Sequence, residues 1–188
     1  MIRHLHRLGQ GLASRSRNLT YRLLGVDFRR YCWLRAVEIP RNWSDIILHG
    51  CALDRGVVLL CSDAPRPGKI EIGEGTYVNR YTVFDAHHSI QVGREVMIGP
   101  HCYITDGNHG FARGASIKSQ PMTAKPVVIE DEAWLGAHVT VLAGVRIGRG
   151  AVIGAGSVVT RDIPANAVAF GSPAIVRRMR GATPTDAA

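Results

Sequence analysis

An apolar residue recurs at every sixth position from residue 72 onward. The recurring positions are Ile72, Val78 and Phe84, then Val92, Ile98 and Ile104 after a slip of two residues, and Ile129, Leu135, Val141, Ile147, Ile153 and Val159 after a longer interruption. In a chain with 46% hydrophobic residues, this set has a chance of about 10⁻⁴ before the choice of phase and gaps is allowed for. A period of six is neither the 3.6-residue period of a helix nor the alternation of a single strand.

Two further regularities follow the same period. Most anchors are followed four residues later by a small or β-branched residue: Thr76, Thr82, Val96, Cys102, Ala133, Val139, Val145, Ala151 and Ser157. The residue directly after an anchor is often glycine: Gly73, Gly93, Gly99, Gly136, Gly148 and Gly154. The pattern predicts flat six-residue faces separated by corners, with three faces closing a coil of about 18 residues. Stacked coils would pair their strands in parallel and bury an aliphatic column.

The chain divides into four segments on this basis. Residues 1–34 lack the repeat and have leucines at helical spacing, which predicts a short basic arm with one or two helices. Residues 35–69 are irregular first coils that Val37, Ile47, Leu53 and Leu59 could anchor. Residues 70–164 form the regular coils, interrupted by a loop at 105–127. Residues 165–188 form a tail whose last seven residues, ATPTDAA, are predicted to be disordered.

The formal charge of +8 is concentrated at the N-terminus. Residues 1–41 hold nine arginines against Asp27 and Glu38, whereas residues 42–188 hold 14 basic and 13 acidic residues. The high isoelectric point therefore describes the arm, and net charge alone is weak support for nucleic-acid binding. We predict no nucleic-acid partner.

Several classes of protein are disfavoured. No apolar run reaches the length of a membrane helix, and the first residues do not resemble a secretory signal, so we expect a cytoplasmic location. Four widely spaced cysteines predict buried thiols in a reducing compartment rather than disulfides or a zinc site. The glycines recur as coil corners and form no phosphate-binding loop.

The interrupting loop contains the clearest candidate for chemistry. It opens with Asp106-Gly107-Asn108-His109-Gly110, in which two glycines flank a polar pair. A neutral imidazole beside acceptors suits a general base near neutral pH, and long loops thrown out of a regular stack are often functional. A surface histidine or a structural hydrogen bond is the alternative interpretation of His109.

Residues 70–178 resemble the hexapeptide acyltransferases, most closely the sugar O-acetyltransferases that act on galactosides, maltose and polysaccharides. The matching stretches are Tyr77-Val78-Asn79, the Gly107-Asn108-His109 of the loop, Lys125–Ile129, Trp134-Leu135-Gly136, Ala143–Gly148, Val152–Thr160 and Gly171–Ala174. The resemblance implies an all-β fold, a left-handed parallel β-helix, although parallel crossovers are usually right-handed. It implies acetyl-CoA as acyl donor and no metal.

The resemblance also assigns roles to residues. His109 would take the proton of an acceptor hydroxyl, the N–H of Ala137 would stabilise the oxyanion, and Asp106 or a backbone carbonyl would orient the imidazole. Contacts with coenzyme A carry over onto Trp134, Ala137, Ala155, Thr160, Arg161 and Arg178. A coil corner for Ala155 and a solvated charge for Arg161 are the alternatives.

The acceptor side carries over onto Asn79, Asp85 and Asn108. The chain is one residue shorter between Asn79 and Asp85 than the galactoside acetyltransferases, and a second asparagine of that family is replaced by Tyr81 or absent. The acceptor pocket is therefore altered, and we expect a saccharide, such as a cell-surface polysaccharide or its precursor, rather than a galactoside.

Other functions stay open at this point. Transfer to the amino group of an amino sugar or an antibiotic is the nearest alternative, followed by a zinc enzyme like the gamma-class carbonic anhydrases and a β-helical scaffold without catalysis. By resemblance the chain forms a homotrimer with sites shared between subunits. Three basic arms on one face of a trimer could also contact an anionic membrane from the cytoplasm, the alternative being a solvated helix packed on the first coil.

Overall fold

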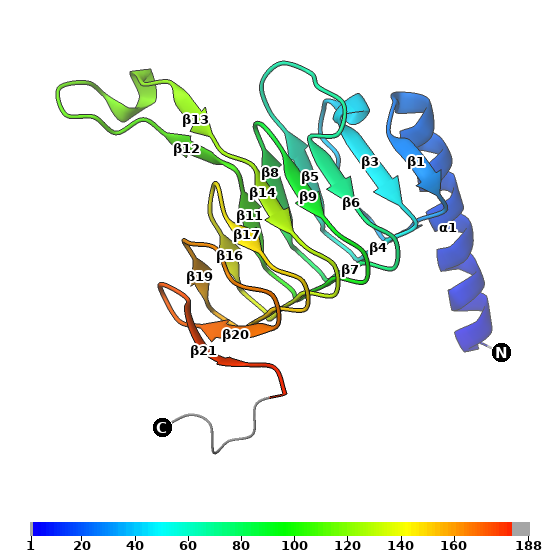
Figure 1. Cartoon of the computed structure of the whole chain (residues 1–188). Helices are drawn as coiled ribbons and strands as arrows, with labels where there is room; N and C mark the ends of the chain where they lie inside the picture. Colours follow the sequence, from blue (N-terminus) through cyan, green and yellow to red (C-terminus); the bar gives the residue numbers. More distant parts are fainter. Residues whose placement is uncertain (1, 182–188) are drawn as a thin grey trace.

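Short strands wind around one axis and form three long sheets in the computed structural model, which describes residues 2–181, with side chains from residue 8 onward (Figure 1). Face A holds β1 (Asp27–Arg30), β3 (Ile46–His49), β6 (Ile70–Ile72), β9 (Ile90–Val92), β14 (Val127–Ile129) and β17 (Arg146–Ile147). Face B holds β2 (Trp33–Leu34), β4 (Ala52–Leu53), β7 (Tyr77–Val78), β10 (Met97–Ile98), β15 (Trp134–Leu135), β18 (Val152–Ile153), β20 (Ala167–Phe170) and β21 (Ile175–Met179). Face C holds β5 (Val58–Cys61), β8 (Val83–Ala86), β11 (Tyr103–Thr105), β16 (Thr140–Val141) and β19 (Val158–Val159).

Strand pairing follows the predicted coil length. The pairs Ile129 with Ile147, Leu135 with Ile153, and Val141 with Val159 are each 18 residues apart in the sequence. Val78 pairs with Ile98 across 20 residues, so the two-residue slip is a wider coil in the middle of the stack. All pairs within the three faces are parallel except β20 with β21. The prediction of an all-β stack of parallel coils is thus confirmed.

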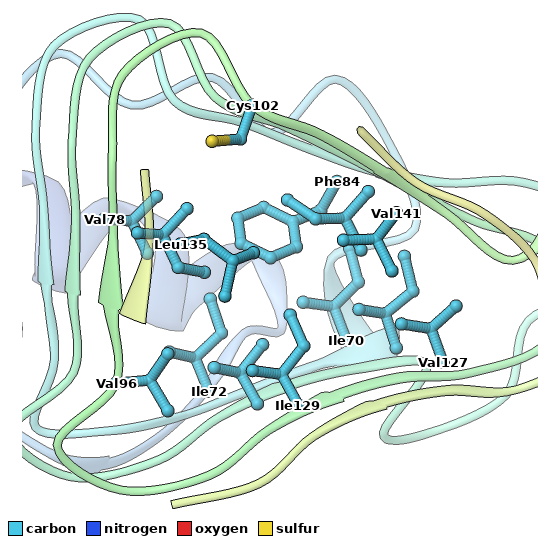
Figure 2. Close-up of a cluster of buried hydrophobic side chains, with 14 of the residues drawn as sticks. Ile70, Ile72, Val78, Phe84, Val96, Cys102, Val127, Ile129, Leu135 and Val141 are labelled. Carbon is cyan, nitrogen blue, oxygen red and sulfur yellow. The ribbon is translucent and has the colours of Figure 1, made fainter. Parts of the chain in front are cut away.

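The twelve anchor residues fill the interior. Each is buried, with at most 3% of its surface exposed. Figure 2 shows Val78, Phe84, Ile129, Leu135 and Val141 pointing inward from the three faces. Because inward positions repeat from coil to coil, aliphatic side chains contact their equivalents above and below, and a continuous core results.

The N-terminal arm is one long helix that closes the first coil. α1 (Ile2–Leu24) contacts β1, β2 and the 3₁₀ turn η1 (Trp43–Asp45), and lies across the end of the stack (Figure 1). Its inner face is polar. Ser14 Oγ accepts the N–H of Leu34 at 2.9 Å, and the Asn18 amide bonds both the N–H and the C=O of Cys32 at 3.1 and 2.8 Å. These side chains satisfy backbone groups at the open edge of the first coil.

The structure differs from the prediction at two segment boundaries and at one anchor residue. The stack begins at β1, inside the predicted 1–34 arm, where Phe28 and Leu34 are buried. Ile47 faces outward, because Ile46 and Leu48 on either side of it are the buried residues of β3. The predicted 165–188 tail contains β20 and β21, and its last residues, 182–188, lie outside the described part.

The corner between faces B and C, here called the B/C corner, is built from residues with left-handed backbone. Tyr81, His101 and His138 each have φ of 58°. Their rings stack, with centroids 5.2 Å apart for Tyr81 and His101 and 4.9 Å apart for the two histidines. The N–H of His101 donates to Arg80 O, and the N–H of His138 donates to Pro100 O. The corner residues of successive coils therefore lie one above another.

Phe84 is a fully buried aromatic residue of the core. Replacing it with alanine should lower the free energy of unfolding by about 3–5 kcal/mol, because the coils on either side are held in register and cannot close the cavity. Urea unfolding followed by circular dichroism measures the change. Phe111→Ala is the matched control, since Phe111 is 81% exposed. A loss no larger in Phe84→Ala than in this control would contradict the packing described.

Candidate active site

The loop that interrupts the repeat is an ordered hairpin at the corner between faces C and A, here called the C/A corner. The chain leaves β11 at Asp106, forms β12 (Gly107–His109), passes through the turn η2 (Ile117–Ser119), and returns along β13 (Met122–Ala124). β12 and β13 pair antiparallel, with His109 opposite Met122, and the hairpin extends away from the stack (Figure 1). The His109 side chain is exposed on it.

The base of the hairpin is fastened by Asp106. Its carboxylate is fully buried and accepts the backbone N–H groups of His87 at 2.7 Å, His88 at 2.8 Å and Ser89. Its carbonyl accepts the N–H of Lys125, where the chain rejoins the stack. Within residues 2–181, no described hydrogen bond joins Asp106 to His109. The predicted orienting residue is thus committed to the turn at 87–89, which fixes where the hairpin starts.

His87 packs against the first residue of the hairpin. The sequence alone does not mark it as part of the site. Its Nδ1 lies 2.9 Å from Asp63 Oδ2, and its Nε2 lies 3.7 Å from Asp85 Oδ1. A Cβ added at Gly107 would come within 2.4 Å of the His87 ring. The first glycine of the loop is therefore required by close packing against this ring.

The predicted acceptor residues lie on two sides of face C. Asp85, on β8, accepts a hydrogen bond from the Tyr103 hydroxyl at 2.9 Å. Burial, together with this bond, raises the pKa of Tyr103 above its usual value. Asn108 is exposed on β12, near the same corner. Asn79 lies instead at the B/C corner, where its Oδ1 accepts the N–H of Arg80 at 2.8 Å.

Ala137 lies at the B/C corner with its N–H unused. Among the described residues, this N–H donates no hydrogen bond. The register of Ile98 with Leu135 places Pro100 at the equivalent position one coil earlier, and proline has no N–H to donate. A half-exposed Trp134 side chain and Ala155, one coil later, lie on the same side. This corner offers a backbone donor, and Trp134 precedes it by three residues on β15 of face B.

The remaining predicted contacts fall on different elements. Thr160 and Arg161 follow β19 at the C/A corner, on the side of the hairpin, and both are exposed. Arg178 is exposed on β21 and pairs with Val168 of face B. One chain therefore brings His109, Asn108, Asp85, Thr160 and Arg161 to the C/A corner of the stack. It brings Ala137, Ala155 and Asn79 to the B/C corner, with Trp134 nearby in sequence on face B.

A cavity of about 690 Å³ lies on face A, away from these residues. Its lining charges pair with one another: His49 with Glu71 at 2.8 Å, and Arg94 with Asp131 at 2.9 Å. Between residues 2 and 181, no three His, Cys, Asp or Glu side chains come together as metal ligands.

Residues 126–161 match the family model described as Bacterial transferase hexapeptide (six repeats). Hexapeptide repeats of the kind that this model describes therefore occupy residues 126–161 of the chain. It is 45% identical over 114 residues to a galactoside O-acetyltransferase of Lactococcus lactis, covering 58% of this chain and 52% of that one. It is 38% identical over 120 residues to the putative lipopolysaccharide biosynthesis O-acetyl transferase WbbJ of Escherichia coli, covering 60% and 61%.

A solved structure shares the repeat architecture. The hexapeptide-repeat acetyltransferase of Vibrio cholerae, in complex with acetyl-coenzyme A, is 31% identical, with a TM-score of 0.58 and 64% of each chain covered. This chain spans between half and two thirds of the length of these relatives.

Replacing Asp106 with alanine tests whether this residue is structural. The change leaves three backbone donors without their acceptor, so the free energy of unfolding should fall by about 2–4 kcal/mol. Asp106→Asn keeps an acceptor oxygen and should lose less. Thermal and urea unfolding measure both variants. Wild-type stability in Asp106→Ala would show that the carboxylate does not hold the hairpin base.

Proposed function

We propose that this hexapeptide-repeat chain is an acetyltransferase that moves an acetyl group from acetyl-CoA to a hydroxyl of a saccharide. The observation that carries the proposal is that one corner presents an exposed histidine on a fastened hairpin, while the neighbouring corner presents a backbone N–H that bonds no described residue. Support comes from the names of the similar proteins, which include a galactoside O-acetyltransferase and an acetyltransferase in complex with acetyl-coenzyme A.

His109 acts as the general base in this proposal. A saccharide hydroxyl is a poor nucleophile at neutral pH, and a positioned imidazole that removes its proton contributes about 10²–10⁴ in rate. The acceptor oxygen then bonds to the thioester carbonyl carbon, the carbon–sulfur bond breaks, and the imidazolium returns the proton to the leaving thiolate. The proton that His109 takes from the acceptor is thus the one that the thiol keeps.

The N–H of Ala137 stabilises the negative charge that develops on the carbonyl oxygen. A preorganised backbone donor acts well here because it needs no rearrangement during the reaction. Trp134 forms an apolar wall beside it, and Ala155 lets a narrow ligand pass close to the corner. Arg161 and Arg178 supply positive charge for the phosphates of coenzyme A.

The two half-sites meet between subunits of a homotrimer. In one chain His109 projects from the C/A corner, whereas Ala137 lies at the B/C corner. Three left-handed stacks, side by side, would set the C/A corner of each chain against the B/C corner of its neighbour. Each site then draws its base from one subunit and its oxyanion donor from the next.

The acceptor is a polysaccharide or its precursor in this proposal. Support comes from the similarity to the relative named for lipopolysaccharide biosynthesis. Asn108 on the hairpin and Asp85 near its base serve as hydrogen-bonding groups for sugar hydroxyls, and Asn79 lies on the edge that a neighbour would supply. An amino group could occupy the same position as the hydroxyl, so N-acetylation is the second candidate.

Replacing His109 with alanine should lower the rate of thiol release by about 10²–10⁴ while coenzyme A still binds. Thiol release from acetyl-CoA is measured with a panel of sugars, sugar nucleotides and polysaccharide fragments. Mass spectrometry of the product identifies the acceptor atom and separates O- from N-acetylation. His88→Ala is a matched control at the same corner. Wild-type rates in His109→Ala would refute the mechanism.

Ala137→Pro removes the proposed oxyanion donor from a position where the preceding coil already carries Pro100. It should lower kcat by about 10²–10³ with little loss of stability. Co-expressing Ala137→Pro with His109→Ala tests the shared site, because a mixed trimer contains an interface with both wild-type half-sites. Activity in the mixture, absent from either variant alone, is expected. No recovery in purified mixed trimers would show that the site lies within one chain.

A further inference from the structure

The outer face of α1 carries an apolar stripe that no side chain among residues 8–181 covers. Leu8, Leu12, Leu19 and Leu23 recur at spacings of four and seven and therefore lie on one side of the helix. Their exposed fractions are 65%, 67%, 61% and 80%. A surface helix ordinarily turns such a stripe toward the core. In α1 the four leucines instead face the solvent.

The inner face of the helix explains this inversion. Ser14, Asn18 and Tyr21 contact the first coil because they bond backbone groups of Cys32, Leu34 and Val37. Closing a strand edge requires polar side chains on the side that faces the stack. The leucines are therefore not needed to dock α1 on the first coil. Their position on the opposite side points to a partner other than the stack.

The charge of α1 indicates which partner. The helix contains five arginines, two histidines and no acidic residue. Arg15 and Arg22 lie on the exposed side, over the rings of Tyr31 and Phe28. An apolar stripe beside cationic side chains is the pattern of helices that lie in the interface of anionic membranes. Each arginine near such a surface contributes about fivefold in affinity.

The position of α1 leaves this face accessible. The helix crosses the end of the stack, and its main contacts are with β1, β2 and η1 (Figure 1). Subunits that pack side by side, as proposed above, would contact one another through the lateral faces and corners rather than through this end. Three helices would then lie at the same end of a trimer, and their binding would be multivalent.

We propose that α1 anchors the protein on an anionic lipid bilayer, with Leu8, Leu12, Leu19 and Leu23 inserted at the boundary between headgroups and acyl chains. The helix lies along the surface. Within residues 2–181, no helix is apolar and long enough to cross a membrane. The stack then stands on the bilayer through its first coil, and the edges carrying the half-sites extend away from it.

Vesicle co-sedimentation of the full-length protein tests the proposal. Wild-type protein should bind vesicles of phosphatidylcholine with about 30% phosphatidylserine, bind pure phosphatidylcholine at least about tenfold more weakly, and be released by salt. Replacing the four leucines with glutamine, which keeps helix propensity, should weaken binding to the anionic vesicles by about 100-fold or more. Ser16→Gln with Thr20→Gln is the matched control on the same helix and should bind as wild type does.

Three results would overturn the proposal. Wild-type protein that stays in the supernatant with anionic vesicles would do so, whatever the variants show. So would undiminished binding of the glutamine variant. A change in molecular mass of that variant, measured by light scattering without lipid, would show that the leucines join copies of the chain. Thiol release from acetyl-CoA in solution should be unchanged, so a failure here is separate from a failure of the proposed activity.

Discussion

The stacking of each inward residue on its equivalent in the next coil is the constraint on which the rest of the structure depends. Because side chains alternate across a strand, a slip of one residue would turn the aliphatic column outward on a whole face. Ile129 above Ile147 and Leu135 above Ile153 hold the register on faces A and B. Because the register of the three faces is fixed, the corners between them can vary in length and conformation without disturbing the core.

This rigidity accounts for how a site can be placed on short strands. The hairpin leaves the stack at a corner, where extra residues do not disturb the pairing of β11 with β8 and β16. Asp106 fixes its starting point by gathering three backbone donors from the turn at 87–89. At the neighbouring B/C corner, the N–H of Ala137, which bonds no described residue, is held by the strands before and after it. The coils thus fix the positions of both the hairpin and this N–H.

The sequence predicts the fold well at positions that have the same structural role in every coil. The anchors and corner residues could be predicted because burial is demanded at the same place in every coil. The first coil was missed, although Phe28 and Leu34 are six residues apart, because no corner glycine accompanies them. At Ile46-Ile47-Leu48 three apolar residues leave the phase undetermined, and the prediction chose the residue that faces outward.

The site could be predicted only in part for a related reason. Local sequence marks His109 by its glycines, but the partner of Asp106 depends on a turn almost twenty residues earlier. His87 carries no signal, because its role comes from packing under Gly107 and from Asp63 and Asp85, which the fold brings together. The division of the predicted contacts between two edges follows from the three-sided coil rather than from any motif.

The polar inner face of α1 also affects how the molecule behaves in bulk. A stack of parallel strands ends in a row of unpaired backbone groups, and such a row can template the addition of another stack. Ser14 and Asn18 occupy that row at the first coil, and β21 runs antiparallel beside β20 at the last. A stack of this kind could in principle add further stacks end to end and form a fibre. The groups at its two ends oppose such growth.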